Sequence, residues 1–448
     1  MPGYAYPATP TVDLVEDHHG NPVADPYRWL EDTDDPDTAA WVKAQNELTE
    51  GFLEKVPARE QIRARLTELW NYPKVGVPFE RGERWFQNRN AGLQDQPVLV
   101  VWDRPATPDD ASAEGRVLLD PNVLSEDDTV AVTQMTVSDD GEMLVYATSE
   151  AGSDWLTWHV RDVATGVDTA DRIEWSKSCR ASLRKDRSGF YYCANEPPVP
   201  GREYLDKTRV RRVLFHRLGT EQAEDELVFA APEEPEWLPD ATVTDDGRFL
   251  IVSISRGTAP ESQLWVLDLA DTAEPATGLR PLVPDFGSIV EAVATVGSTF
   301  YLLTDHEAER RRIVAVDFDR PDRDHWREVV PESADTLRDA HWFGGRLVCH
   351  YLHDAHSVVR VHELDGTHVR DIPLPGIASL EGIEGRHDRD LVHLLATSFT
   401  ESGSLWLHDL GSGQTALVRP SGCRIDPAAY VTEQVSVTRP TEHVSRSS

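Results

Sequence analysis

The N-terminal part of the chain carries apolar residues at helical spacing. Between Asp37 and Trp70 they recur every three or four positions among Glu, Gln, Lys and Arg; they are Ala39, Ala40, Trp41, Leu48, Phe52, Leu53, Ile62, Leu66 and Trp70. This spacing places the apolar side chains along one face of a helix. Because proline cannot continue helical hydrogen bonding, Pro57 divides the segment. The sequence therefore predicts two short helices over residues 37–70.

From about Val75 the pattern changes to short apolar runs that are typical of strands. A turn glycine precedes such a run seven times, at intervals of 40 to 59 residues; these glycines are Gly82, Gly141, Gly189, Gly247, Gly297, Gly345 and Gly385. A second apolar run follows each of them, as at residues 98–103, 158–162 and 405–409. Asp-Asp-Gly precedes two of the first runs, at 139–141 and 245–247, and suits a tight hairpin.

Seven repeats of this size, each with two hairpins, are typical of a propeller built from four-stranded blades. A single four-stranded sheet cannot bury both of its faces, whereas neighbouring blades in a closed ring cover one another. A β-sandwich, the alternative, would show strands about 8 to 12 residues apart without a longer period. The predicted fold class is therefore mainly β: a seven-bladed β-propeller preceded by a short α-helical segment.

Composition narrows the partners. The 448 residues carry a formal net charge of −34, which disfavours nucleic acid and anionic membranes, and 40% hydrophobic residues suffice for a core. We find neither a signal peptide after Met1 nor a run of about 18 apolar residues. The cysteines, Cys179, Cys193, Cys349 and Cys423, lack metal-site spacing and suit reduced thiols. We expect a cytoplasmic protein with no membrane contact.

Short motifs also recur along the chain in a fixed order. The first is Val-Ala-Asp-Pro-Tyr-Arg-Trp-Leu-Glu at 23–31; the others include residues 72–75, 90–94, 119–122, 153–155, 218–220, 351–354 and 430–435. Each string is short, but together and in this order they resemble the prolyl oligopeptidase family of serine peptidases. The resemblance extends over about residues 6 to 437.

This resemblance implies an organisation and an activity. In that family an N-terminal segment packs on an α/β-hydrolase domain, and a seven-bladed propeller covers the active site and excludes large substrates. The activity is endopeptidase cleavage of short peptides after proline. The implied domains are residues 1–74, a helical segment that would pack on a hydrolase domain; 75–426, the propeller; and 427–448, a truncated start of the hydrolase domain with a disordered tail. The α/β-hydrolase domain itself is expected to be absent from the chain.

The expected catalytic chemistry is missing from the sequence. A hydrolase of this type needs a G-x-S-x-G nucleophile elbow, with Asp and His later in the chain. No such motif occurs, and the nearest fragments, Gly152-Ser153, Gly297-Ser298 and Gly403-Ser404, fall in predicted blade turns. We therefore assign no catalytic residue and expect no hydrolysis by the chain alone.

One histidine cluster is a candidate metal site. His350, His353 and His356, with Asp354, lie close together in sequence. Along a strand, however, a spacing of three places side chains on opposite faces. We predict no metal site and no cofactor.

The family resemblance marks three residues as substrate-lining. Trp175 matches a propeller aromatic that lines a peptide subsite, and packing within the blade is its structural alternative. Residues 255–258 match a loop near the active-site opening that can carry a basic residue and a reactive thiol. Here Thr258 occupies the thiol position and Arg256 is offset by one residue from the basic position, so a surface ion pair is the alternative for Arg256.

Three functions follow from these observations. The first is a substrate-gating propeller of a post-proline serine endopeptidase, acting on short proline-containing peptides when joined to a hydrolase domain. The second is a non-catalytic binding scaffold. The third is one half of a split peptidase whose hydrolase domain docks in trans on the N-terminal helices. We expect the apolar helix faces around Trp41, Leu48, Phe52 and Trp70 to be poorly covered.

Overall fold

The structure, a computed structural model, describes residues 4–104, 107, 109, 114–127, 129–198, 210–270 and 278–436. The chain divides into two units, one formed almost entirely by residues up to 71 and the other by most residues from 72 onward. Most of the tail predicted at 427–448, from residue 437 on, lies outside the described residues.

The N-terminal unit holds the two predicted helices and one hairpin. Its elements are β1 (Val15–His18), β2 (Asn21–Ala24), the 3-10 turn η1 (Arg28–Glu31), α1 (Pro36–Leu53) and α2 (Arg59–Trp70). The Asp35 carboxylate accepts a hydrogen bond from the Asp37 amide, and Pro36 occupies the first turn, which are common features of a helix start. Pro57 lies between the helices, as predicted.

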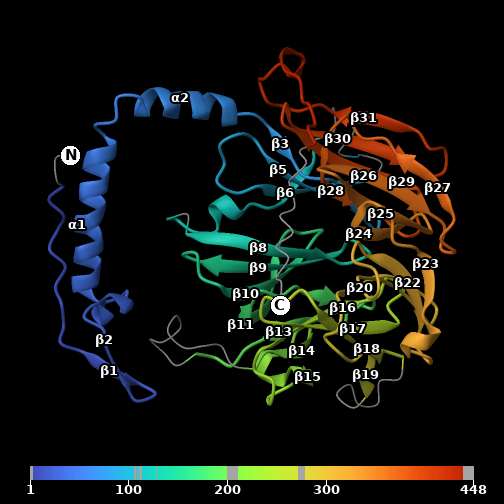
Figure 1. The fold of residues 1–448 in the computed structure, drawn as a ribbon, viewed down its shortest axis with the longest axis horizontal. Coiled ribbons are helices and arrows are strands. Elements are labelled where there is room, and N and C mark those ends of the chain that lie inside the picture. Colours follow the sequence, from blue (N-terminus) through green and yellow to red (C-terminus); the bar gives the residue numbers. More distant parts are fainter. Residues whose placement is uncertain are drawn as a thin grey trace, which may run out of the picture. The chain divides into compact units, whose positions relative to one another are not determined.

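The second unit contains seven antiparallel sheets, each built from strands that follow one another in sequence (Figure 1). We number them as blades. Blade 1 comprises β3 (Lys74–Val75), β4 (Phe79–Arg81), β5 (Arg84–Asn90), β6 (Val98–Asp103) and β7 (Arg116–Leu119). Blade 2 comprises β8 (Val130–Val137), β9 (Met143–Glu150), β10 (Trp155–Asp162) and β11 (Asp168–Lys177). Blade 3 comprises β12 (Ser182–Leu183), β13 (Gly189–Ala194), β14 (Arg212–Arg217) and β15 (Glu226–Ala230).

The remaining four blades repeat this plan. Blade 4 comprises β16 (Trp237–Val243), β17 (Phe249–Arg256), β18 (Ser262–Asp268) and β19 (Arg280–Val283). Blade 5 comprises β20 (Val290–Val296), β21 (Thr299–Thr304), β22 (Arg312–Asp317) and β23 (Arg327–Val330). Blade 6 comprises β24 (Thr336–Phe343), β25 (Arg346–His353), β26 (His356–His362) and β27 (His368–Ile372). Blade 7 comprises β28 (Ser379–Glu384), β29 (Leu391–Ser398), β30 (Glu401–Asp409) and β31 (Thr415–Arg419).

Four 3-10 turns accompany the blades. They are η2 (Pro121–Val123), η3 (Gln222–Glu224), η4 (Arg323–His325) and η5 (Pro427–Ala429). The seven-bladed propeller predicted from the sequence is confirmed. The apolar runs after the turn glycines are the second strands of the blades, and the runs that follow are the third strands.

Tight turns between first and second strands bring neighbouring blades into backbone contact. Gly82 and Gly141 have φ of +56° and +73°, a region that side chains disfavour. A Cβ on Gly141 would lie 2.4 Å from the Arg81 carbonyl oxygen, and one on Gly82 would lie 2.0 Å from that of Asp140. Glycine is therefore required at both turns by conformation and by space.

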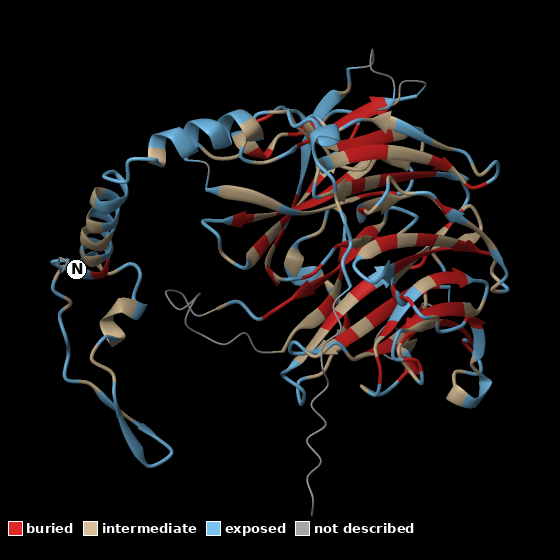
Figure 2. Ribbon diagram, turned by 45° about the horizontal axis from the view of Figure 1, so that its top comes forward, coloured by how far each residue is buried: buried red, intermediate tan, exposed pale blue. Residues whose placement is uncertain are grey.

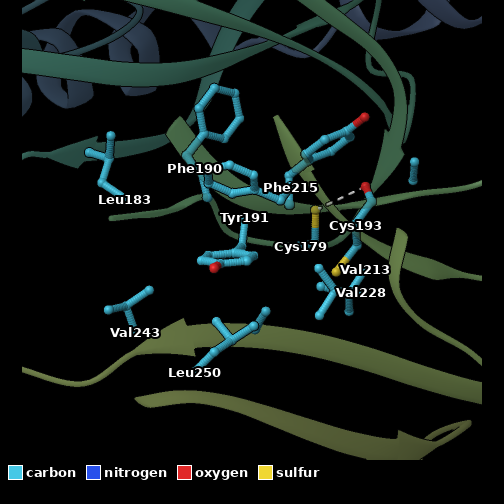
Figure 3. Close-up of a cluster of buried hydrophobic side chains, with 14 of the residues drawn as sticks. Cys179, Leu183, Phe190, Tyr191, Cys193, Val213, Phe215, Val228, Val243 and Leu250 are labelled. Atoms are coloured by element: carbon cyan, nitrogen blue, oxygen red, sulfur yellow. Dashed lines mark hydrogen bonds between the residues drawn. The ribbon is translucent and has the colours of Figure 1, made fainter. Parts of the chain in front are cut away.

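Buried residues lie along the strands of the blades (Figure 2), and the blades pack on one another through aromatic and aliphatic side chains. Between blades 4 and 5, the Phe249 ring lies 5.2 Å from Phe300 and 5.1 Å from Phe318. Between blades 3 and 4, Tyr191 and Phe215 belong to a buried cluster that includes Val243 and Leu250 (Figure 3). The core is thus a series of apolar layers between sheets.

Side chains, and not a shared strand, join the last blade to the first. The His393 ring lies 5.4 Å from Trp85, and Arg389 lies 3.8 Å from the Glu80 carboxylate. Every strand ladder among the described residues is antiparallel, so this part of the chain contains no α/β-hydrolase sheet. Within the same residues, no helix combines the length and apolar character needed to cross a membrane.

Candidate functional site

Two cavities lie along the first strands of the blades. One of about 350 Å³ is lined by residues from six blades and so lies on the propeller axis; its lining includes Arg81, Asp139, Asp245, Ala292, Trp342 and Arg386. The other, of about 360 Å³, lies between β16 and β20. First strands thus surround a polar central channel, as expected when each blade points one strand at the axis.

Carboxyl groups in this channel are partly removed from water. Burial raises the pKa of Asp240 on β16, of Glu291 on β20 and of Glu384 on β28. For Asp240, hydrogen bonds from the Ala241 and Arg180 amides oppose this rise, and for Glu384 the opposing charges include Arg81. The channel is therefore polar and costly for an unpaired charge.

The two ends of the propeller differ in the loops they carry. We call the end with the turns between first and second strands the turn end, and the end with the loops between second and third strands the hairpin end. Asp139 and Asp245 belong to the turn end, where the 350 Å³ cavity opens. Trp175, Arg256 and Thr258 all lie at the hairpin end, because Lys177 pairs with Trp155 at the start of β10 and Arg256 ends β17.

Trp175 lies in an irregular part of β11. Its φ is +63°, and the ladder with β10 shifts register between Leu156 and Trp158. The Trp175 ring packs edge-on against Trp155 at 5.4 Å, and its carbonyl accepts a hydrogen bond from the Asn195 amide at 2.9 Å. The side chain remains partly exposed. The Trp175 side chain therefore packs on the blade and is also partly exposed at its surface. The bulge makes this possible because it interrupts the regular alternation of inward-facing and outward-facing side chains along β11.

Arg256 and Thr258 lie in blade 4, so blade 3 separates them from Trp175. The Arg256 guanidinium lies 5.1 Å from the centre of the Phe286 ring, and Phe286 packs at 5.6 Å on Trp237. Among the described carboxylates none forms an ion pair with Arg256. Thr258 is exposed in the loop after β17. The three residues thus share one end of the propeller and lie on two blades that are separated by a third.

A further pocket at the hairpin end was not foreseen from the sequence. It measures about 490 Å³ and is formed by residues 398–402 of blade 7 and by the returning segment around Cys423, Ile425 and Tyr430. Beside it Phe399 is 97% exposed. No periodic signal marks these residues, because loop side chains acquire neighbours through tertiary structure.

Blade 6 contains an Asp–His–Ser arrangement that the sequence also did not reveal. The His350 Nδ1 atom lies 2.9 Å from Asp339 Oδ2, and Nε2 lies 2.8 Å from the Ser357 hydroxyl. Burial alone would raise the pKa of Asp339, but hydrogen bonds from His341 and His350 lower it. The three side chains have the connectivity of a charge-relay triad.

Its surroundings assign this trio a structural role. Ser357 is 7% exposed, its oxygen accepts the Leu380 amide at 2.9 Å, and its amide donates to the Ala378 carbonyl at 2.9 Å. Ser262 occupies the same place in blade 4 and bonds Val290 and Ser288 of blade 5 in the same way, without a histidine. Ser357 is therefore one of two equivalent links to the next blade, and it lies outside the three cavities.

The histidine cluster weighed as a metal site is divided by the structure. His350 turns to Asp339 and Ser357, whereas His353 and His356 face each other across the hairpin at 5.2 Å. His353 Nδ1 lies 2.6 Å from Asp335 Oδ1. Over the described residues, no group of three His, Cys, Asp or Glu side chains has the geometry to hold a metal ion.

Comparison with known proteins agrees with this architecture. The family model described as the N-terminal β-propeller domain of prolyl oligopeptidase matches residues 7–421. The chain belongs to the prolyl oligopeptidase family.

Two curated members of the prolyl oligopeptidase family illustrate the extent of the match. The prolyl endopeptidase of Elizabethkingia meningoseptica is 31% identical over 433 residues, which cover 97% of this chain and 59% of that protein. The dual function macrocyclase-peptidase POPB of Galerina marginata is 30% identical over 354 residues, covering 74% and 48%. The chain thus spans less than two thirds of either relative.

Solved structures show the same fold. One from a study of two prolyl endopeptidases has a TM-score of 0.73 and 34% identity, over 94% of this chain and 60% of that one. Prolyl oligopeptidase B from Galerina marginata, bound to a 25mer macrocyclization substrate, has a TM-score of 0.84 and 24% identity, over 95% and 62%.

Proposed function

We propose that this chain is the substrate-gating propeller of a serine endopeptidase that cleaves short peptides after proline. The observation that carries the proposal is the polar cavity of about 350 Å³ at the turn end, which is lined by residues from six blades. A channel of this size, lined by partly desolvated charged groups, admits a flexible peptide more readily than a folded protein. In this proposal Trp175, Arg256 and Thr258 line the path of the peptide at the hairpin end.

The chain would supply selection, and a hydrolase domain would supply the nucleophile. In the described residues the one Asp–His–Ser arrangement is used to join blades 6 and 7. Exposed apolar side chains on the helices, including Phe52, Ile62 and Leu66, support a surface for that domain, in the same chain or in trans. A stand-alone binding scaffold would have less use for these helices.

The first test measures peptidase activity of the purified chain on a chromogenic proline-containing peptide. We expect no turnover by the wild type. We also expect no change in peptidase activity in Ser357→Ala, because Ser357 is buried and bonded to the next blade. Turnover that a serine-directed inhibitor abolishes would contradict the proposal.

The second test supplies the hydrolase domain. The matching part of the Elizabethkingia meningoseptica endopeptidase is replaced by this chain, and the hybrid is assayed on a short peptide and on a folded protein that displays the same cleavage sequence in an exposed loop. We expect cleavage of the peptide only. Trp175→Ala should raise KM, whereas Trp326→Ala, at a partly exposed tryptophan outside the three cavities, serves as the matched control. A folded hybrid that cleaves both substrates equally would contradict gating.

A further inference from the structure

One position of the blade repeat is occupied by a cation in some blades and by a neutral group in others. It is the residue near the end of the third strand, one before the turn into the fourth strand. Arg161 fills it in blade 2, His216 in blade 3, His362 in blade 6 and His408 in blade 7. Because the backbone setting repeats, the partners of each side chain reveal what the position does.

In blade 2 the position joins two blades through a permanent charge. Arg161 forms two hydrogen bonds with Asp168, at 2.7 and 3.0 Å, and Asp168 also accepts the Tyr146 hydroxyl at 2.9 Å. The same guanidinium donates to the Leu118 carbonyl of blade 1 at 2.8 Å. Arg161 therefore ties its own fourth strand to the outer strand of the preceding blade.

Blade 3 repeats this arrangement with a histidine. His216 Nδ1 lies 2.7 Å from Asp225, which precedes β15 as Asp168 begins β11, and Asp225 accepts the Tyr192 hydroxyl at 2.7 Å. His216 Nε2 lies 3.1 Å from Asp171 on the outer strand of blade 2. Tyrosine, aspartate and cation thus recur at equivalent places, with Asp171 as the contact on the preceding blade.

The geometry requires a protonated ring at His216. A neutral imidazole has one N–H donor, so one of its nitrogens would direct a lone pair at a carboxylate; only the imidazolium donates from both. The His216 ring is fully buried, and the Asp171 and Asp225 side chains are 4% and 1% exposed. Water therefore does not relieve a missing hydrogen bond at this site.

The equivalent histidines in blades 6 and 7 lack this second partner. His362 Nδ1 bonds the Gly366 carbonyl at 3.2 Å, and His408 Nδ1 bonds Thr415 at 2.8 Å. Among the described residues, the buried Nε2 atom of each ring has no hydrogen-bond partner. Burial lowers the pKa of His362 and of His408, and both are expected to be neutral.

We propose that the His216 imidazolium is a proton-dependent pin between blades 2 and 3, and that it takes the place that the permanently charged Arg161 takes between blades 1 and 2. Loss of this one proton would leave two buried carboxylates facing an uncharged ring. The junction between blades 2 and 3 would then loosen while the junction between blades 1 and 2 stays intact.

The groups around His216 set the direction of the pH dependence. Those that face it are Asp171 on β11, Asp225 before β15, and Phe190 and Tyr192 on β13. Burial lowers the pKa of His216, but hydrogen bonds to Asp225 and Asp171 outweigh burial and raise it. A raised pKa means that the stabilisation is complete below the unfolded value of about 6.5 and is lost as pH rises through the folded value.

Asp171 responds in the opposite sense. Burial would raise the pKa of Asp171, but hydrogen bonds from Thr169, the Gly219 amide and His216 lower it. Its contribution is therefore present at neutral pH and is lost only as pH falls through the depressed value. The pin is therefore strongest at pH values between the lowered pKa of Asp171 and the raised pKa of His216. Its loss at alkaline pH is caused by deprotonation of His216.

The pin also fixes the strand that carries Trp175. Three residues after Asp171, the backbone of Glu174 exchanges two hydrogen bonds with the Gln222 side chain, at 3.0 and 3.1 Å. Release of Asp171 would loosen β11 up to this point. The pin itself does not depend on the proposed role of Trp175.

The test is hydrogen exchange by mass spectrometry on the full chain as pH rises from mildly acidic to mildly alkaline, corrected for intrinsic rates. In the wild type we expect exchange in residues 168–177 to rise by up to about tenfold per pH unit between about 6.5, the free value of histidine, and the raised pKa of His216, and to level off above that pKa. His216→Gln should exchange fast at every pH. His408→Gln, the repeat-equivalent control, should keep the wild-type pH dependence.

A second measurement tests the proposal on the wild-type chain, in case His216→Gln does not fold. Histidine carbon NMR of the wild type should show one buried ring that titrates above the free value, while the rings of His362 and His408 titrate below it. Asp171→Asn should move the high value down. The proposal is wrong if no buried ring titrates above the free value, or if His216→Gln keeps the alkaline rise in exchange.

Discussion

The N-terminal unit and the propeller bury their side chains to very different degrees. Among the described residues of the N-terminal unit Thr38 is the one buried residue, whereas buried apolar residues recur in every blade of the propeller (Figure 2). On the helices Phe52 is 48% exposed and Leu66 is 60% exposed.

The difference shows which unit supplies its own stability. Each blade covers the face of its neighbour, so the propeller gains buried apolar area at every junction. The helices have the apolar residues of a buried element without a surface that covers them. Most helical stability in proteins comes from such packing, so this unit is expected to be stable only when a partner covers its apolar faces.

The sharpest test of the comparison uses the same substitution in both units. Phe249→Ala removes a fully buried ring between blades 4 and 5 and should lower the free energy of unfolding by about 3–5 kcal/mol. Phe52→Ala should change it by less than about 0.5 kcal/mol, because that ring is half exposed. Urea denaturation measures both. Equal losses would mean that the helices carry as much stability as the blades.

A glycine pair should give effects of opposite sign. Gly141→Ala places a side chain at φ +73° and 2.4 Å from the Arg81 carbonyl, which should cost about 1–3 kcal/mol. Gly51→Ala lies in α1 with open space around the new Cβ and should favour the helix by about 0.5–1 kcal/mol. Denaturation followed by fluorescence and far-UV circular dichroism reports the two effects. Destabilisation at Gly51 would show that α1 is packed against something.

The smallest effect on stability is expected on the exposed helix face. Leu66→Lys should leave the free energy of unfolding within about 0.5 kcal/mol of the wild type. It should also reduce the binding of a hydrophobic fluorescent dye, because it interrupts the apolar face of α2. If a monodisperse wild-type chain bound no dye, the conclusion that the apolar face of α2 is exposed would be wrong.

Sequence reasoning found the second and third strands of every blade but not the first and fourth. The central strands are covered on both faces and read as apolar runs, as in Phe249–Arg256, where the first four residues are buried. First strands face the channel and carry residues such as Asp240 and Glu291, and fourth strands, apart from β11, are short and partly exposed. The first and fourth strands mix apolar and polar residues in sequence, because one face of each strand is polar.

The candidate site divides in the same way. The family resemblance predicted Trp175, Arg256 and Thr258 as site residues. It did not predict that they lie at the same end of the propeller, or that the Arg256 guanidinium packs on the Phe286 ring. The buried trio of Asp339, His350 and Ser357 and the pin at His216 had no motif, because their partners are distant in sequence.

By itself, the sequence determined the number of blades, the two helices and the missing nucleophile elbow, since these depend on local periodicity and short motifs. Only the tertiary structure decided which polar groups are buried together. Asp171 and His216 are 45 residues apart and meet at a blade junction, where hydrogen bonds to Asp225 and Asp171 raise the pKa of His216 against the effect of burial. Burial is a property of the assembled ring, so no single strand could reveal it.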